Sequence, residues 1–181
     1  MPVAFAATIC LAYAPYLSVG AKAALGFLPG YAEQEGLESG DRFFLLSLAR
    51  RVIPGGVPGS VYIILAFGLL CFLAAWSLRR AERSDAGFLT ASCILATAFT
   101  VLLSPHYSWY FSWLVPLMCF VPAAELFYLT AASFVLYGTW LGDAPEQLFR
   151  LNAALYLPFG LLAVISVAVR YAARWTSQSR R

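Results

Sequence analysis

The sequence predicts an all-α membrane protein: a polytopic transmembrane helix bundle of about six spans, with one further helix at the membrane interface. The composition is the first observation, because 61% of the 181 residues are hydrophobic and only 12% are charged, whereas soluble domains have about 25% charged residues. An aromatic content of 16% excludes a disordered chain. The apolar residues also form long runs without the alternating polarity of barrel strands.

Six apolar runs are predicted to span the bilayer as one membrane domain, residues 1–181. They cover residues 3–19, 60–78, 87–103, 107–122, 123–141 and 154–171. A spanning helix needs about 20 mostly apolar residues, and lipid offers the backbone no other hydrogen-bond partner. The fourth run is short and contains Pro116. The first run lacks the basic start of a signal peptide, so we expect a span there and not a cleaved leader.

The long connection at residues 20–59 is predicted to contain a helix at residues 41–51. Apolar residues recur there at helical spacing with arginines at the edges, and Asp41 is suited to the N-cap. This pattern is typical of an amphipathic helix lying in the membrane interface. A surface helix packed on the bundle would show the same pattern. The turn-rich residues 54–59 separate this helix from the second span.

The basic residues predict the orientation of the spans. The short connection at residues 79–85 carries three arginines, and the tail after the last span is basic as well. Basic connections favour the cytoplasmic side, so six spans place both termini in the cytoplasm. The connections at residues 20–59, 104–106 and 142–152 then lie on the opposite side.

An acidic stretch at residues 31–42 is the first candidate for a functional site. It has four carboxylates, among them Glu33 and Glu35, together with two glycines. Such a loop is able to hold a divalent metal ion or to accept hydrogen bonds from sugar hydroxyls. A solvated loop, whose charges keep it out of the lipid, accounts for the same composition and is favoured by composition alone.

The second candidate is the aromatic stretch at residues 104–113, which holds the single histidine, His106. Aromatic residues at the end of a span usually form the interfacial belt, which accounts for Trp109 and Tyr110 but not for an imidazole. A histidine at this depth can bind phosphate as a cation or pass a proton near neutral pH. Arg150 is the third candidate, because its planar guanidinium suits phosphate; a snorkelling arginine is the alternative.

Other chemistry is not indicated by the sequence. The four cysteines lie within apolar runs and not at metal-ligand spacing, which favours buried small hydrophobic residues over disulfides or a zinc site. A net charge of +3 is too small to argue for a nucleic-acid partner. Serine-hydrolase, Walker, Rossmann and HExxH motifs do not occur. The residues alone therefore assign no catalytic residue and no cofactor.

The stretch at residues 104–116, SPHYSWYFSWLVP, resembles the "P-H-Y-x-W-Y-x-x-W-x-x-P" stretch late in bacterial polytopic glycosyltransferases of the GT-C type. The closest group is glycosyltransferase family 87 and its mannosyltransferase-like relatives. The segment from Pro15 through GFLPGYA at residues 26–32 to residues 43–46 also looks like these enzymes. The resemblance extends, in order, from Pro15 to Pro122.

The resemblance implies a hexosyltransferase at the periplasmic face of the bacterial inner membrane. Such enzymes pass a sugar from a polyprenyl-phosphate donor to a lipid or glycan acceptor. It implies donor binding by the aromatic stretch, the acidic loop and the arginine before the last span. These residues are His106, Tyr107, Trp109, Tyr110, Glu33, Glu35 and Arg150.

The chain departs from the family in two respects. Family members commonly have a tryptophan and an asparagine between "Y-A" and the interfacial helix, where this chain has EQEGLE at residues 33–38. The second departure concerns the catalytic acid. The catalytic acid of GT-C enzymes lies in the first extracytoplasmic loop, near the N-terminus of a much longer protein. We therefore expect this chain to correspond to the C-terminal part of the larger fold. A split gene, a truncated reading frame or a partner chain that supplies the N-terminal half would each account for this. The alternative is a non-enzymatic membrane subunit or a transporter fragment. The span interiors are nearly free of charge, which argues against transport but not against a scaffold.

Overall fold

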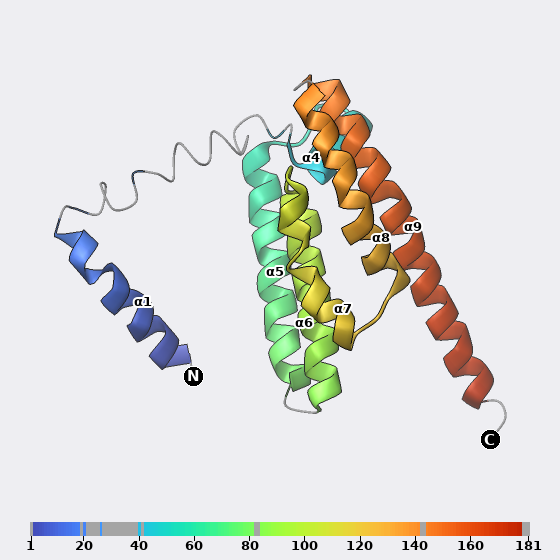
Figure 1. Ribbon diagram of the computed structural model, residues 1–181, viewed down its shortest axis with the longest axis horizontal. Helices are drawn as coiled ribbons and strands as arrows, with labels where there is room; N and C mark the ends of the chain where they lie inside the picture. The colour runs from blue at the N-terminus through green and yellow to red at the C-terminus, as the bar shows by residue number, and fades with distance from the viewer. Residues whose placement is uncertain are drawn as a thin grey trace. The chain divides into compact units, whose positions relative to one another are not determined.

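A computed structural model describes residues 2–18, 20, 26, 40, 42–81, 84–141 and 144–178 of the chain. The regular secondary structure of these residues is entirely helical, which confirms the predicted all-α class. The chain divides into two units, Met1–Glu38 and Ser39–Arg181, and each is described by itself. Figure 1 shows the helices and their order along the chain.

Unit 1 contributes one described helix, α1 (Pro2–Leu17). Its described side chains, from Val3 to Tyr16, are all exposed within the unit, and it is apolar on every side. Sixteen residues extend for about 24 Å, whereas the hydrocarbon core is about 30 Å thick. The first predicted span, residues 3–19, is thus present as an apolar helix, but it is shorter than the three helices of unit 2 that are long enough to cross a membrane.

Unit 2 contains three long apolar helices: α5 (Gly59–Ala81), α6 (Asp85–Leu103) and α9 (Pro145–Gln178). Within the described part of the chain, these are the helices that are long and apolar enough to cross a membrane. They contain the spans predicted at residues 60–78, 87–103 and 154–171, but α9 begins nine residues before its predicted span, within the connection predicted at residues 142–152. Uniformly apolar runs of this length leave the backbone only its own helical hydrogen bonds in lipid.

The predicted spans at residues 107–122 and 123–141 are not single long helices, so the prediction of six such spans is wrong in this region. The fourth consists of η1 (Ser108–Phe111) and α7 (Leu114–Phe120), and the fifth of α8 (Ala124–Ala132) followed by η2 (Ser133–Leu141). In Figure 1, α7 runs back beside α6, and α8 with η2 returns to the end where α9 begins.

Prolines account for the breaks in this region. Pro116 lies in the first turn of α7, where a helix does not need the missing N–H. In the interior of a longer helix, the proline ring would clash with the carbonyl four residues earlier, so the helix cannot extend further back along the chain. Pro122 disfavours helical geometry at the residue before it, and Val121 has φ −127° and ψ 74°. The helix therefore ends at Phe120, and a new one begins at Ala124.

Proline also lies inside α9, at Pro158. It cannot donate to the carbonyl of Ala154, four residues earlier, and in lipid that carbonyl needs another partner. The hydroxyl of Tyr128 on α8 donates to it at 2.8 Å. This bond lets α9 continue through the proline and joins α8 to α9.

Helix α4 (Phe44–Val52) corresponds to the helix predicted at residues 41–51 but begins three residues later, and its N-cap is Phe43, so the prediction of Asp41 as the N-cap is wrong. Phe44 and Leu46 are buried on its inner face, where it packs against α9. Phe44 joins six residues of the neighbouring helices in one buried core. The seven residues are Phe44, Phe111, Leu114, Leu129, Leu136, Leu155 and Tyr156. The location of α4 in the membrane interface stays a prediction.

The four cysteines are free thiols. Cys93 is buried in a small cluster with Met118, as a small hydrophobic residue would be. Cys71 and Cys119 in unit 2, and Cys10 in unit 1, are exposed on the surfaces of apolar helices. The expectation of buried cysteines therefore holds for Cys93 alone.

Candidate functional site

The structure brings four of the predicted site residues together as one aromatic cluster: His106, Tyr107, Trp109 and Tyr110. The rings of Tyr107 and Trp109 are stacked, with centroids 4.2 Å apart and planes 10° apart. The imidazole of His106 lies 4.0 Å from the Tyr107 ring. Tyr110 is 6.2 Å from Tyr107 and 6.1 Å from Trp109. Trp109 and Tyr110 are exposed, so the cluster presents ring surface to the outside.

The local fold explains why these rings meet. Ser104 ends α6 in the left-handed region, with φ 44° and ψ 57°, and turns the chain into the short helix η1. Ser108 and Phe111 are buried and anchor η1 on the core. A turn bond from the N–H of Tyr110 to the carbonyl of Tyr107, at 3.2 Å, then sets the rings side by side. Exposed aromatic rings of this kind can stack on the apolar face of a sugar.

The acidic part of the predicted site lies outside the described residues. Glu33 and Glu35 both belong to that stretch, so their convergence with His106 stays a prediction. Among the residues that the structure describes, no three histidine, cysteine or acidic side chains are grouped as metal ligands. A divalent metal in the acidic loop therefore also stays a prediction.

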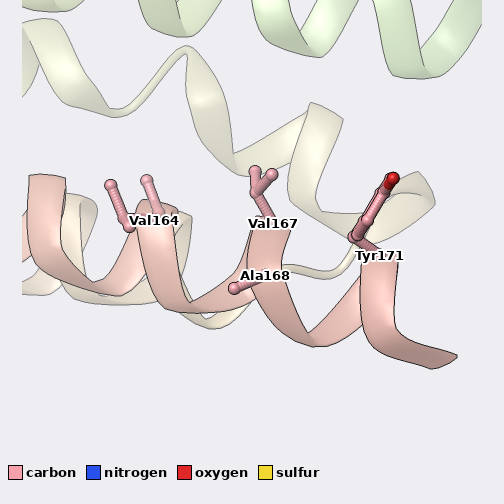
Figure 2. Close-up of a pocket in the computed structure, with 5 residues that line it drawn as sticks. Val164, Val167, Ala168 and Tyr171 are labelled. Carbon is pink, nitrogen blue, oxygen red and sulfur yellow. The ribbon is translucent and has the colours of Figure 1, made fainter.

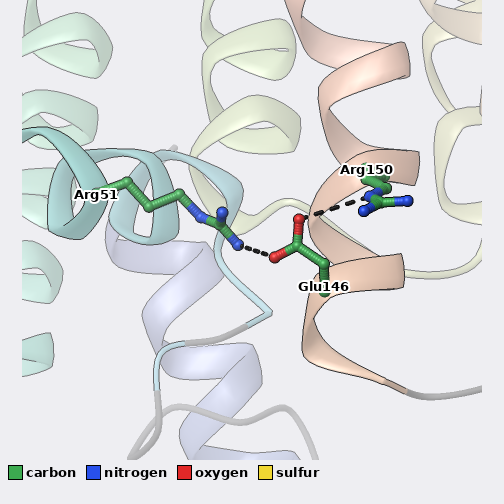
Figure 3. A network of polar contacts seen from close by, with 3 residues as sticks. All are labelled: Arg51, Glu146 and Arg150. Carbon is green, nitrogen blue, oxygen red and sulfur yellow. Dashed lines mark hydrogen bonds and ion pairs between the residues drawn. The ribbon is translucent and has the colours of Figure 1, made fainter.

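Arg150 belongs to a second group of polar side chains, shown in Figure 3 with Arg51 and Glu146. Nη2 of Arg51 lies 2.7 Å from Oε2 of Glu146, and Nε of Arg150 lies 3.5 Å from Oε1 of the same carboxylate. The Arg51 guanidinium also covers the ring of Phe149 at 3.7 Å. Two cations thus share one anion, and the side chain of Arg150 is 78% exposed. Its guanidinium is accessible to a phosphate.

A third group of polar side chains is buried beneath α4: Ser104, Asn152 and Tyr156. Oγ of Ser104 accepts a hydrogen bond from the N–H of Phe44 at 3.2 Å and donates to the carbonyl of Val101 at 2.9 Å. Oδ1 of Asn152 and the hydroxyl of Tyr156 are buried without a hydrogen-bond partner in the described part of the chain. Buried polar atoms are seldom left in this state.

At the opposite end of unit 2, Glu125 in the first turn of α8 contacts α9. Its carboxylate accepts from Oγ of Ser166 at 2.8 Å and from Nη2 of Arg170 at 3.2 Å. The Glu125 side chain is largely buried, whereas that of Arg170 is more than half exposed. These contacts join residues 41 and 45 positions apart and depend on the tertiary fold.

Helix α9 also carries an open, apolar hollow near this end, shown in Figure 2. It is lined by Ala163, Val164, Val167, Ala168 and Tyr171. The lining has almost no polar surface, which suits a lipid chain and not a phosphate or a sugar. This hollow therefore does not belong to the predicted site.

Two residues of the second group, Arg51 and Glu146, were not predicted as site residues. The spacing of Glu146 and Arg150, four residues apart on a helix, is a signal that was present in the sequence. The approach of Arg51 from α4 depends on the tertiary fold. Comparisons with protein families, with curated proteins and with solved structures find no match to this chain.

Proposed function

We propose that unit 2 binds the phosphate and sugar of a polyprenyl-phosphate donor at its α4 end, as part of an integral-membrane glycosyltransferase at the periplasmic face of a bacterial inner membrane. The α4 end is where α4 lies, α6 ends and α9 begins (Figure 1). The proposal depends mainly on one observation: the exposed aromatic cluster and the exposed Arg150 both belong to this end of an apolar bundle. The resemblance of residues 104–116 to GT-C enzymes supplies the reaction class.

The positions of the charged residues on α9 support a location of the α4 end at the level of the lipid phosphates. Arg150 and Arg170 are separated by an uninterrupted run of uncharged residues, 151–169. Twenty helical residues rise by about 30 Å, which is about the thickness of the hydrocarbon core. With Arg150 at one boundary and Arg170 at the other, Arg150 lies at the level of a lipid phosphate.

The composite segment α8–η2 is consistent with the same two boundaries. Nine α-helical and nine 3-10 residues rise by about 31 Å in total, at 1.5 and 2.0 Å per residue. The segment begins beside Arg170, through Glu125, and ends close to the start of α9. In this proposal it crosses the bilayer without being one long α-helix.

The proposal assigns binding, and not proton transfer, to the α4 end. Transfer to an acceptor hydroxyl with inversion requires a carboxylate base. In this proposal the base comes from the acidic stretch with Glu33 and Glu35 or from a partner chain. The acceptor is a lipid or a glycan.

Binding of polyprenyl phosphate to the purified chain in nanodiscs, measured by native mass spectrometry, tests the donor site. Arg150→Ala should weaken binding about tenfold, because a charge-assisted hydrogen bond contributes about 1.5–3 kcal/mol. His106→Ala should reduce sugar transfer from a radiolabelled donor in membranes that contain the chain. Arg79→Ala removes an exposed arginine from the other end of the bundle and should change neither measurement.

Equal effects of Arg150→Ala and Arg79→Ala would contradict the donor site. Binding that depends on Arg150 without any transfer above membranes lacking the chain would favour the alternative of a non-enzymatic subunit.

The proposed orientation has its own test. Ala144 lies at the α4 end and Ala86 at the opposite end of unit 2, and both are exposed. In a variant without the native cysteines, Ala144→Cys should react with a membrane-impermeant maleimide in cells with a permeabilised outer membrane. Ala86→Cys should react only after the inner membrane is opened. Labelling of both residues from the same side would contradict the orientation.

A further inference from the structure

The face of α9 beneath α4 carries two buried polar residues within an otherwise apolar contact. Phe149, Asn152 and Tyr156 recur at a spacing of three and four residues, which places them on one helix face. The ring of Phe44 from α4 lies 5.8 Å from that of Phe149 and 5.3 Å from that of Tyr156. Asn152, between them on the helix, is therefore on the face that α4 covers, and it is only 2% exposed.

Two buried polar atoms on this face are not used by the fold. Oδ1 of Asn152 and the hydroxyl of Tyr156 have no hydrogen-bond partner among the described residues. The Ser104 hydroxyl lies close to that of Tyr156 but not in hydrogen-bonding geometry with it, and it bonds instead to the N–H of Phe44 and the carbonyl of Val101. An unpaired polar atom in a buried site lowers the stability of the folded protein, so apolar residues would serve a purely structural contact better.

The chemistry of this face selects a neutral ligand with hydroxyl groups. Asn152 offers an acceptor and Tyr156 a group that both donates and accepts. The buried polar side chains on this face are uncharged, which disfavours a phosphate or a carboxylate here. The rings of Phe44, Phe149 and Tyr156 provide apolar faces of the kind on which sugars stack.

We propose that Asn152 and Tyr156 form a subsite for the hydroxyl groups of a sugar, and that α4 is a lid which uncovers it. The inference rests on the proposed function only for the choice of a sugar as the ligand. It adds two residues, Asn152 and Tyr156, that belong neither to the aromatic cluster nor to the Arg150 group. It also adds a moving element, α4, whose Arg51 contacts Glu146 of that group.

The ends of α4 are suited to such a movement. Gly40 precedes the helix with φ 70°, and Gly55 follows it with φ 88°. A side chain at Gly40 would meet Leu46 and the Arg50 guanidinium, so the glycine is required for the covered arrangement. Hinges are formed by a few residues at the ends of an element, and both ends of α4 have residues of this kind.

The subsite is tested by thermal unfolding of the full chain in nanodiscs. Tyr156→Phe and Asn152→Leu should each raise the Tm of the protein without ligand by about 3–6 °C, because each removes an unpaired buried polar group. Tyr128→Phe is the matched control: its hydroxyl is bonded to Ala154, so its loss should lower the Tm. The same substitution, tyrosine to phenylalanine, is thus expected to raise the Tm at position 156 and to lower it at position 128.

Ligand binding is measured in the same assay with octyl glucoside below its micellar concentration. The glucoside should raise the Tm of the unsubstituted chain and of Tyr128→Phe, and this rise should disappear in the Asn152→Leu/Tyr156→Phe double variant. An octyl tetraoxyethylene ether, which has the same chain without the sugar hydroxyls, should have no such effect. A lower Tm for Tyr156→Phe would mean that a bridging water already satisfies these groups and would overturn the proposal. An equal response to both amphiphiles would overturn it as well.

The lid is tested by cysteine labelling in a variant without the native cysteines. Leu46 on α4 and Leu129 on α8 are both fully buried, but only Leu46 becomes accessible when α4 moves away. Leu46→Cys should react with a water-soluble maleimide at least tenfold faster than Leu129→Cys. Equal rates at the two positions would overturn the lid. These measurements use no donor and no transfer reaction, so failure of the proposed glycosyltransferase activity is distinguishable from failure of the subsite.

Discussion

The N-terminus of α4 depends on a residue that lies sixty positions away in the sequence, and this dependence can be measured. The residue at the N-cap, Phe43, has no side chain that can cap the helix. Instead, Oγ of Ser104 accepts the hydrogen bond from the N–H of Phe44, at 3.2 Å. Ser104 is only 2% exposed, so in its absence water has little access to that N–H. Ser104→Ala should therefore destabilise the attachment of α4 to the bundle.

The magnitude follows from the structure. Loss of a capping hydroxyl costs about 1 kcal/mol, and a buried N–H left without a partner costs about 1–3 kcal/mol. These figures describe the same bond and are not added, so we expect a loss of about 1–2 kcal/mol. In a chain of this size 1 kcal/mol corresponds to about 2–4 °C in Tm. Ser104→Ala should therefore lower the Tm by about 2–8 °C.

The assay is thermal unfolding of the full chain in detergent micelles, followed by circular dichroism. Ser112→Ala is the matched control, because the Ser112 hydroxyl is exposed and bonds only to the carbonyl of Trp109, three residues earlier. Its removal should change stability by less than about 0.5 kcal/mol. If the two variants have the same Tm, the hydroxyl of Ser104 does not support α4 and the capping argument is refuted.

Two further predictions concern stability and use the same unfolding assay. Leu155→Ala should cost about 2–5 kcal/mol because it leaves a cavity in the core, whereas Leu157→Ala, two residues along α9 and 55% exposed, should be nearly neutral; similar losses would contradict the assignment of the inner face. Arg170→Ala should cost about 1–2 kcal/mol, a value reduced for the exposure of the arginine, because it leaves the Glu125 carboxylate largely buried without its cation. Adding Glu125→Gln should recover most of that loss, and Arg79→Ala should show none.

The long apolar helices could be predicted from the sequence because their formation depends on local composition. Residues 60–78, 87–103 and 154–171 have few polar groups, and a helix satisfies their backbone wherever they lie in the bundle. Residues 107–122 were different, because the run was apolar but short and contained Pro116. A single proline hardly changes the mean hydropathy of such a run, whereas its missing N–H acts on the backbone. The span was predicted from the hydropathy of the run, and the missing N–H of the proline divided the segment into two short helices.

The candidate site was predictable to the extent that it is local. His106, Tyr107 and Trp109 lie within four consecutive positions, and a single short turn brings their rings together. The contact between Arg51 and Glu146 joins residues 95 positions apart, and no local pattern contains it. The burial of the unpaired Oδ1 of Asn152 depends on α4 covering that face of α9, which is a property of the whole unit.

The two ends of unit 2 differ in whether their arginines can accept a new anion. At one end, Arg170 contacts a carboxylate that is 14% exposed and that also receives a bond from Ser166, so an incoming phosphate would leave Glu125 unpaired in an apolar setting. At the α4 end, the side chain of Glu146 is 55% exposed and two guanidiniums share it. When a phosphate approaches, the Glu146 side chain can rotate into the solvent at little cost in free energy. A phosphate-binding site is therefore more favourable beside Arg150 than beside Arg170, although both arginines end the same uncharged stretch of α9.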